Sequence, residues 1–565
     1  MILFSCIYLS TNFLYLFLNI TEIGYYGVFF LTIINLLYCS IQLFWKIYDL
    51  WIYNYSEEYV MFNWLDFGNN LNIFWNIKEN FINNIIAFVM IFGATIVSIF
   101  VFFEMNNDKE GQNFIIVLGY FIIFMLLVIG SNNLILFYLG WEGISLTSYF
   151  LVNFWSERVR SIKAVTKIFI ISKIGDFFII IFISLIIKIF GTVDFDNINS
   201  IYILFLNNKF FFILNYINLN ELLGLILLLG TCVKSAQYGF HIWLLEAMEA
   251  PLGASALMHS STLVIAGVIL LYKLSIVIEF STYAQFLMFT MGCLSATMGS
   301  LLACFQFELK VILAYSTISN MGYIFILFSV GAYYEMMIIL ILHAFIKIYM
   351  FLVIGGIIYQ SNGSQDIRWL GGLMVYTPFL WISYVIGGFS LIGLPYFSGY
   401  FYKNFLINNL INNLIYLKGG EFVLLISYFF TIFYVSRLGY LVFLNNKNGH
   451  KNIYKIKNFS IFYIISLFIL GIVIVFGQYF WINLIYMNIK NISNSYFFNL
   501  FQNYQYYLYE LTYLSSYLWI LIYMFTLMFL FYLNFLNLNL NWNFFKNWSF
   551  LVSFFCIIFL FFVII

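Results

Sequence analysis

Apolar runs long enough to cross a membrane follow one another along almost the whole sequence, and they limit the possible fold more than any other feature. Hydrophobic residues make up 64% of the 565 residues and charged residues only 8%, which excludes an ordinary soluble globular protein. Because about 20 consecutive apolar residues form one helical crossing, we predict an all-α polytopic membrane protein with about 15–17 transmembrane helices. The predicted spans lie near 1–20, 24–45, 82–104, 113–131, 132–154, 164–190, 221–238, 251–278, 283–304, 309–330, 335–359, 372–393, 396–415, 421–444, 459–485, 512–535 and 548–565.

Three stretches between the apolar runs are polar. Residues 46–81 are rich in aromatic and turn-forming residues, so we expect a surface loop that contains a hairpin. Residues 191–220 form a second polar loop, and residues 445–458 form a basic one. The short loop after the fifth predicted span is also basic, with Arg158, Arg160, Lys163 and Lys167. Basic loops stay on the inner side of a membrane, so this loop is expected there and residues 46–81 on the outer side.

The stretch 230–267 combines ionisable residues with breaks in the helical pattern. Gly239 and Pro251, one of only three prolines in the chain, interrupt it. Its ionisable residues are Lys234, His241, Glu246, Glu249 and His259. A charged group at the centre of a membrane costs roughly 2.5–3.5 kcal/mol on insertion scales, and a broken helix is tolerated there only inside protein or beside a wet cavity. We therefore predict an ion or proton path through this stretch.

Two further sites precede it. Glu142 lies in the fifth predicted span among apolar and hydroxyl residues, which favours a functional carboxyl over one that merely reaches the headgroups. Lys173 and Asp176 are three residues apart and share one helical face. The pair can simply neutralise itself, and the spacing leaves a functional role and a structural role equally open.

Lys234 and His259 are the main candidates within the stretch 230–267. Twelve residues separate Lys234 from the nearest charge before it. Burial penalises the charged form of a lysine, so such a group can exchange a proton; the alternative is a lysine that extends to the membrane surface. His259 precedes three hydroxyl residues and could relay protons through water. A hydrogen-bonded packing histidine is the alternative.

The second half of the chain repeats this layout. His343 and Lys347 are four residues apart on one predicted helix, and two basic groups on one face repel each other unless one is neutral. A second break at Pro395 is followed by Lys403. A broken helix with a lysine thus occurs twice, as in transporters built from two structural repeats. Lys310, beside Glu308, begins a span with many hydroxyl side chains.

Other functional classes lack their signatures. The six cysteines form no CxxC pair, so neither an iron–sulfur cluster nor a zinc site is expected in this chain. There is no GxGxxG and no phosphate-binding loop, so no nucleotide cofactor is expected. A net charge of +1 gives no basic field for nucleic acid. The N-terminal region has no basic amphipathic transit segment, and such an apolar protein is hard to import, so we expect synthesis inside an organelle.

Seven strings in this order, over about residues 60–410, resemble the subunit 5 family of mitochondrial respiratory complex I, an antiporter-like (Mrp-type) family. They are GWEGISLTSYFL, KIGD, KSAQYGFHIWLLEAMEAPLGASALMHSSTLVIAG, ELKVILAYSTISNMGY, HAFIKIYMFLVIGG, SQDIRWLGGL and GLPYFSGYFYKN. HSST and HAF-x-K distinguish this family from its two antiporter-like sibling families in the complex.

The resemblance implies a fold of two inverted five-helix repeats with two broken helices, a surface hairpin and a hydrophilic axis across the membrane plane. On that basis residues 1–112 hold N-terminal helices and the hairpin, 113–278 the first repeat, 279–445 the second repeat and 446–565 the C-terminal helices. The resemblance also implies proton transfer by seven residues, with Glu142 paired to Lys234. They are Glu142, Asp176, Lys234, His259, His343, Lys347 and Lys403.

The implied function is proton translocation in the membrane arm of complex I, in the mitochondrial inner membrane. NAD, FMN, iron–sulfur clusters and ubiquinone would be held by other subunits, and the partners would be sibling and supernumerary subunits and lipids. Alternatives are a subunit of a multi-subunit Na⁺/H⁺ antiporter and a scaffold without a complete proton path. The chain departs from the family in three places: Asn404 replaces an acidic residue, Tyr238, Gly239 and Leu245 replace the usual prolines, and the lateral helix expected at 486–511 is too short.

Overall fold

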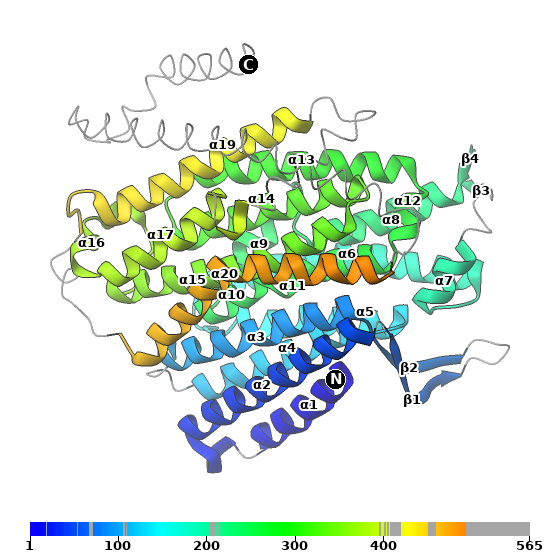
Figure 1. Ribbon diagram of the computed structural model, residues 1–565, viewed down its shortest axis with the longest axis horizontal. Helices are drawn as coiled ribbons and strands as arrows, with labels where there is room; N and C mark the ends of the chain where they lie inside the picture. Colours follow the sequence, from blue (N-terminus) through cyan, green and yellow to red (C-terminus); the bar gives the residue numbers. More distant parts are fainter. Residues whose placement is uncertain are drawn as a thin grey trace. The chain divides into compact units, whose positions relative to one another are not determined.

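The computed structural model describes residues 1–18, 20–53, 55–66, 72–105, 108, 110–202, 209–212, 215–394, 397–400, 403, 406, 420–449 and 459–492 (Figure 1). The chain divides into two units, Met1–Tyr513 and Leu514–Ile565, and all described residues belong to the first. Its helices lie roughly parallel to one another (Figure 1). Among the described residues, ten helices are long and apolar enough to cross a membrane, and three shorter apolar helices accompany them. The chain is therefore a multi-pass helical membrane protein, as predicted.

The first 104 residues form three helices and a hairpin. They are α1 (Ile2–Leu18), α2 (Ile20–Tyr53), β1 (Glu57–Asp66), β2 (Asn72–Glu79) and α3 (Phe81–Glu104). The antiparallel pairing of β1 with β2 confirms the predicted hairpin. The predicted start of the loop at residue 46 was wrong, because α2 remains helical up to Tyr53. Helix α2 is kinked at Gly24, whose φ of 72° belongs to the left-handed region that glycine adopts most easily.

The next elements lead to the first break. They are α4 (Gly111–Gly130), α5 (Leu134–Val152), α6 (Val159–Phe190), α7 (Phe195–Tyr202), β3 (Lys209–Phe212), β4 (Asn215–Asn218) and α8 (Leu219–Lys234). The loop predicted at 191–220 therefore contains a short helix and a small hairpin. The two hairpins and α7 lie at the same end of the helix bundle (Figure 1), and an ion pair between Lys78 and Asp196 links the first hairpin to α7.

The region predicted to be broken is indeed interrupted. After α8 come α9 (Ile242–Glu246), η2 (Ala247–Glu249), α10 (Leu252–Ser260), α11 (Leu263–Lys273) and α12 (Ser275–Glu279). Gly239 has a φ of 99°, and Pro251 separates η2 from α10, so both predicted breaks are confirmed.

The span predicted at 251–278 is confirmed by the candidate span Leu252–Lys273, but its helix stops and restarts at Ser261 and Thr262. The reason lies in the hydroxyl side chains that follow His259. Ser260 Oγ donates to Ala256 O and Thr262 Oγ1 donates to Leu257 O, at 2.5 and 2.9 Å. Such side chains compete with the hydrogen bonds of the helix itself.

In the second half of the chain, other helices surround the buried helix α15 (Tyr333–Gln360). Its elements are α13 (Thr282–Phe305), α14 (Leu309–Ser329), α15 (Tyr333–Gln360), η3 (Ile367–Trp369), α16 (Leu373–Tyr376), α17 (Pro378–Ile392), α19 (Gly420–Gly439), the π-helical turn η4 (Tyr440–Leu444) and α20 (Ile461–Ile492). Helix α15 contacts α3, α10, α14, α17 and α20, so helices from both halves of the chain surround it. The predicted spans at 512–535 and 548–565, most of 396–415 and the lateral region beyond Ile492 lie outside the described residues.

Helices α13 and α14 meet along a seam of small residues. A Cβ atom added to Gly322 would lie 2.6 Å from Ala296 N, and one added to Gly299 would lie 2.9 Å from Ser319 N. The two backbones therefore touch. Close contact through small residues is the usual way in which membrane helices associate, because lipid offers no hydrophobic drive between them.

We predict that Gly322→Ala lowers the melting temperature of the detergent-purified protein, because the methyl group must separate α13 from α14, a type of overpacking that costs about 1–3 kcal/mol. Gly471→Ala is the matched control. Its added Cβ would lie 3.7 Å from Tyr349 Oη, an ordinary contact, inside helix α20. Equal melting temperatures for the two variants would contradict the close packing of the seam.

Candidate functional site

Four ionisable side chains from three helices gather beside Trp141. Glu142 comes from α5, Lys173 and Asp176 from α6, and Lys234 from the last residue of α8. The helices can approach this closely because α6 faces α8 through glycine: a Cβ added to Gly175 would lie 2.8 Å from Val233 Cβ. Two acidic and two basic groups thus share one site, and their formal charges balance.

Lys173 holds both carboxylates of this site. Its Nζ lies 2.5 Å from Glu142 Oε2 and 3.2 Å from Asp176 Oδ2. Tyr138, one helical turn before Glu142, donates its hydroxyl to Glu142 Oε1 at 2.5 Å. The ion pair of Lys173 with Asp176 that the spacing suggested therefore forms. Lys173 forms a second ion pair, with Glu142.

Lys234 is buried and reaches Trp141 rather than Glu142. Its Nζ donates to Trp141 O at 3.4 Å and lies 5.0 Å from the centre of the indole ring, a cation–π contact. The indole Nε1 in turn donates to Asp176 Oδ1 at 2.8 Å. The resemblance implied a pair of Glu142 with Lys234. Among the described residues Glu142 forms its ion pair with Lys173, and Lys234 interacts with Glu142 only electrostatically.

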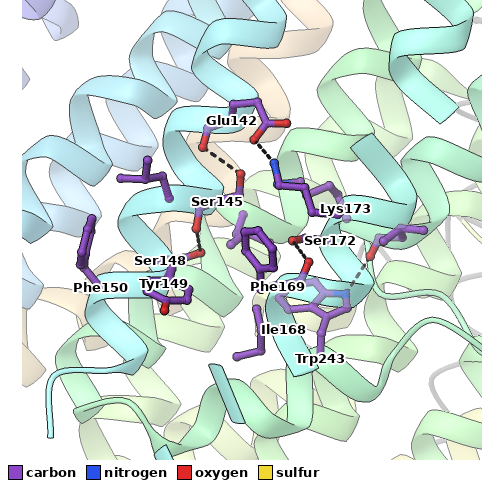
Figure 2. Close-up of a pocket in the computed structure, with 14 residues that line it drawn as sticks. Glu142, Ser145, Ser148, Tyr149, Phe150, Ile168, Phe169, Ser172, Lys173 and Trp243 are labelled. Carbon is purple, nitrogen blue, oxygen red and sulfur yellow. Dashed lines mark hydrogen bonds and ion pairs between the residues drawn. The ribbon is translucent and has the colours of Figure 1, made fainter. Parts of the chain in front are cut away.

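A cavity of about 280 Å³ adjoins this site (Figure 2). Figure 2 shows Glu142 and Lys173 facing each other near Ser145 and Ser172. The cavity is also lined by Leu146 and Phe150, whose side chains are more than half exposed on the surface of this chain. It is large enough for several water molecules, which need polar partners such as these hydroxyls.

A second site lies between α10, α14 and α15. Lys347 is fully buried, and its Nζ donates to Ser316 Oγ at 2.5 Å and to Leu313 O at 3.4 Å. Among the described residues it has no carboxylate partner. His343 lies one turn earlier on the same buried helix, which confirms the predicted common face.

His259 and His343 are both buried, and neither ring nitrogen of either has a protein hydrogen-bond partner among the described residues. The His259 ring stacks on Phe351, with ring centres 5.8 Å apart. Lys347 interacts electrostatically with both histidines. Lys347, His259 and His343 therefore lie near one another, as the resemblance implied. The alternative of a hydrogen-bonded packing histidine has no protein partner for His259 among the described residues.

Lys403 marks a third position. Its Nζ donates to Ile392 O at 2.8 Å and to Thr431 Oγ1 at 3.1 Å, and lies 4.8 Å from the centre of the Tyr428 ring. It thus binds a carbonyl at the end of α17, where Gly393 has a φ of 86°. The predicted break at Pro395 and the departure at Asn404 fall outside the described residues.

The structure gives His241 and Glu104 roles that differ from what the sequence suggested. His241 is only partly buried, accepts a hydrogen bond from Gly239 N at 3.3 Å and stacks on Tyr238, so it stabilises the break locally. Glu104, which the sequence did not single out, binds the first turn of α10. Its only sequence signal was a carboxyl at the end of an apolar run, which looks like an ordinary helix end.

Comparisons with known proteins identify the family of this chain. Residues 131–433 match the family model described as "NADH:quinone oxidoreductase/Mrp antiporter, TM", a range that includes all seven predicted site residues. A curated relative named NADH-ubiquinone oxidoreductase chain 5 from Chondrus crispus is 36% identical over 68% of this chain and 59% of its own length. The protein of the same name from Trichophyton rubrum is 31% identical over 81% of this chain and 69% of its own length.

A solved structure has a similar fold. The Mrp complex from Dietzia sp. DQ12-45-1b contains a chain that superposes with a TM-score of 0.71 at 18% identity, covering 86% of this chain and 51% of that one. At this identity the likeness concerns the fold alone. Since the family model matches more than half of the chain, and a relative above 30% identity is covered over more than two thirds of its length, this chain belongs to the NADH:quinone oxidoreductase/Mrp antiporter family of membrane proteins.

Proposed function

We propose that this chain is a proton-translocating subunit in the membrane arm of NADH:ubiquinone oxidoreductase, respiratory complex I. In this proposal it lies in the mitochondrial inner membrane and is encoded in the organelle. The observation that carries the proposal is the buried Lys347, which is held by a hydroxyl and a carbonyl and lies near two buried histidines. The names of the relatives and the family match support the choice of complex.

The surroundings of Lys347 favour proton exchange. A buried ammonium group is costly unless it is paired and fully hydrogen-bonded. Lys347 has two protein acceptors for its three N–H donors. The neutral amine form of Lys347 is therefore low enough in free energy to be populated. His343, one turn away on α15, can take up or supply the proton.

Electrostatic coupling can make neighbouring sites respond to each other. Two positive charges about 8 Å apart interact by about 2 kcal/mol at an effective dielectric constant of about 20. This energy changes the occupancy of a protonated state by more than tenfold. A proton that arrives at one of Lys347, His343 and His259 therefore disfavours a second proton nearby. The work of moving each proton against the membrane potential is about 2.3 kcal/mol per 100 mV.

Electron transfer has no part in this chain under the proposal. NAD, FMN, the iron–sulfur clusters and ubiquinone would be bound by other subunits, whose redox steps supply the free energy. Within the described residues, no group of three or more His, Cys, Asp or Glu side chains is placed to hold a metal ion. The partners would be the antiporter-like sibling subunits, supernumerary subunits and lipids, and no nucleic acid.

The decisive experiment is a native gel of mildly solubilised membranes stained for NADH oxidation, with this chain located by mass spectrometry. We expect it in the NADH-oxidising band at megadalton mass. If it migrates in a smaller band without NADH oxidation, the complex I proposal fails and a sodium-dependent antiporter becomes the function to test.

We predict that Lys347→Met abolishes proton pumping by assembled membranes that still oxidise NADH, because methionine fills the space but cannot bind a proton. The measurement is the quenching of a pH-sensitive dye in sealed vesicles. Lys188→Met is the matched control, since Lys188 is an exposed lysine in the last turn of α6. Full pumping by the Lys347 variant would mean that the chain is a scaffold without a complete path.

We predict that Trp141→Phe lowers the ratio of protons pumped to NADH oxidised. Phenylalanine keeps the ring but removes the N–H that binds Asp176 Oδ1, and a buried acceptor left without its partner costs about 1–3 kcal/mol. Trp45→Phe, on the exposed face of α2, is the control. The same ratio in both variants would show that Trp141 does not link Asp176 to Lys234.

A further inference from the structure

The break before α10 is held by two charged side chains from other helices. Glu104, the last residue of α3, accepts hydrogen bonds from Leu252 N at 2.8 Å and Gly253 N at 2.9 Å. Lys310, on α14, donates to Met248 O at 3.2 Å and Ala250 O at 2.9 Å. Two backbone donors after Pro251 and two backbone carbonyls before it are therefore bound by charged groups.

This arrangement controls the position of α10. Helix α10 is buried over all nine of its residues and carries His259 in its last turn. His259 lies seven positions after Leu252, which is about 10 Å along a helix. A Cβ added to Gly253 would lie 2.2 Å from Val101 Cγ2, so the start of α10 also packs tightly against α3. A shift of the first turn of α10 must therefore move His259.

A cavity adjoins the Glu104 side chain. A cavity of about 270 Å³ is lined by Phe100, Phe103, Glu104, Leu252, Tyr359 and Asn362, among others, and is large enough for several water molecules. Glu104 itself is partly exposed. Water in this cavity would supply a proton to the carboxylate while it binds the backbone of α10.

Several charged side chains near Glu104 respond to its change of charge when it takes up a proton. The positive charge of Lys310 attracts the Glu104 carboxylate, and the negative charge of Asp108, just after α3, repels it. Around Lys310 lie the further charges of Glu249, Glu308 and Arg158. Proton uptake by Glu104 removes an acceptor from the start of α10 and leaves Lys310 with less compensation.

We propose that Glu104 is a positioning residue of the proton path. As a carboxylate it fixes the first turn of α10, and after taking up a proton from the cavity it releases that turn, so the position of His259 depends on the protonation of Glu104. This inference rests on the proposed function, because it assigns Glu104 a role through His259.

Hydrogen exchange of the backbone amides in the intact complex, read by mass spectrometry, tests the proposal. In the natural protein we expect the protection of residues 252–260, corrected for the intrinsic exchange rate, to fall as the pH falls. In Glu104→Gln the segment should exchange roughly tenfold faster at neutral pH and lose this dependence on pH, because a glutamine offers one oxygen and turns its own N–H₂ toward the second backbone donor.

Glu221→Gln is the matched control. Glu221 accepts hydrogen bonds from Thr282 N and Tyr283 N at the start of α13, a helix that carries none of the seven predicted site residues. We expect this variant to loosen residues 282–283 and to leave both residues 252–260 and the pH profile of pumping unchanged. Glu104→Gln should flatten that profile.

Two results would overturn the inference: protection of residues 252–260 that does not change with pH in the natural protein, or pumping profiles that are equal in the Glu104 and Glu221 variants. The first needs no variant, so a failure of Glu104→Gln to assemble leaves the test intact. Lys347→Met measured in parallel separates the two proposals. If that variant pumps normally, the proposed function fails, whatever the exchange data show.

Discussion

Backbone N–H and C=O groups at helix ends need partners inside an apolar protein, and this requirement shapes the whole bundle. Charged side chains from distant parts of the chain meet it. Glu79 binds the N-terminal ammonium and Leu3 N at the start of α1. Lys273 donates to the last carbonyls of α4, and Arg437 donates to Cys304 O and Gln306 O at the end of α13. The chain has few charges, and many of those described hold helix ends that would otherwise be unsatisfied.

The same kind of contact holds two of the predicted site lysines inside the bundle. Lys403 binds the carbonyl that ends α17, and Lys234 ends α8 and binds a carbonyl of α5. A lysine that gives up its proton keeps fewer donors for such carbonyls. Protonation and the fixing of a helix end are therefore linked at Lys403, and the link is direct because the same nitrogen serves both. The acceptor of Lys234, Trp141 O, lies in the middle of α5. Lys347 also binds inside a helix, since Leu313 and Ser316 both lie within the neighbouring helix α14.

Sequence patterns predicted what depends on local spacing. The common face of His343 and Lys347 followed from helical periodicity, and the hairpin within residues 46–81 followed from its aromatic and turn-forming residues. The breaks at Gly239 and Pro251 followed from the conformational limits of glycine and proline. Contacts between helices could not be predicted in this way. Lys173 rather than Lys234 holds Glu142 because α5 packs beside α6, and the role of Glu104 needs α3 beside α10. The interruption at Ser261 and Thr262 depends on which backbone carbonyls accept hydrogen bonds from the hydroxyl groups.

The burial of α15 has a consequence for how the protein is made. The apolar core of this helix is buried entirely within the chain. Once the chain has folded, Lys347 is therefore surrounded by other parts of the protein and not by lipid. One of the helices that cover it, α20, begins at Ile461, about 100 residues after α15 ends. During synthesis α15 therefore enters the bilayer before its enclosure is complete, and Lys347 must be sheltered by the earlier helices α3, α10 and α14 in the meantime. The helices that precede α15 in the sequence must therefore pack around it first, and α17 and α20 complete the enclosure of Lys347 later.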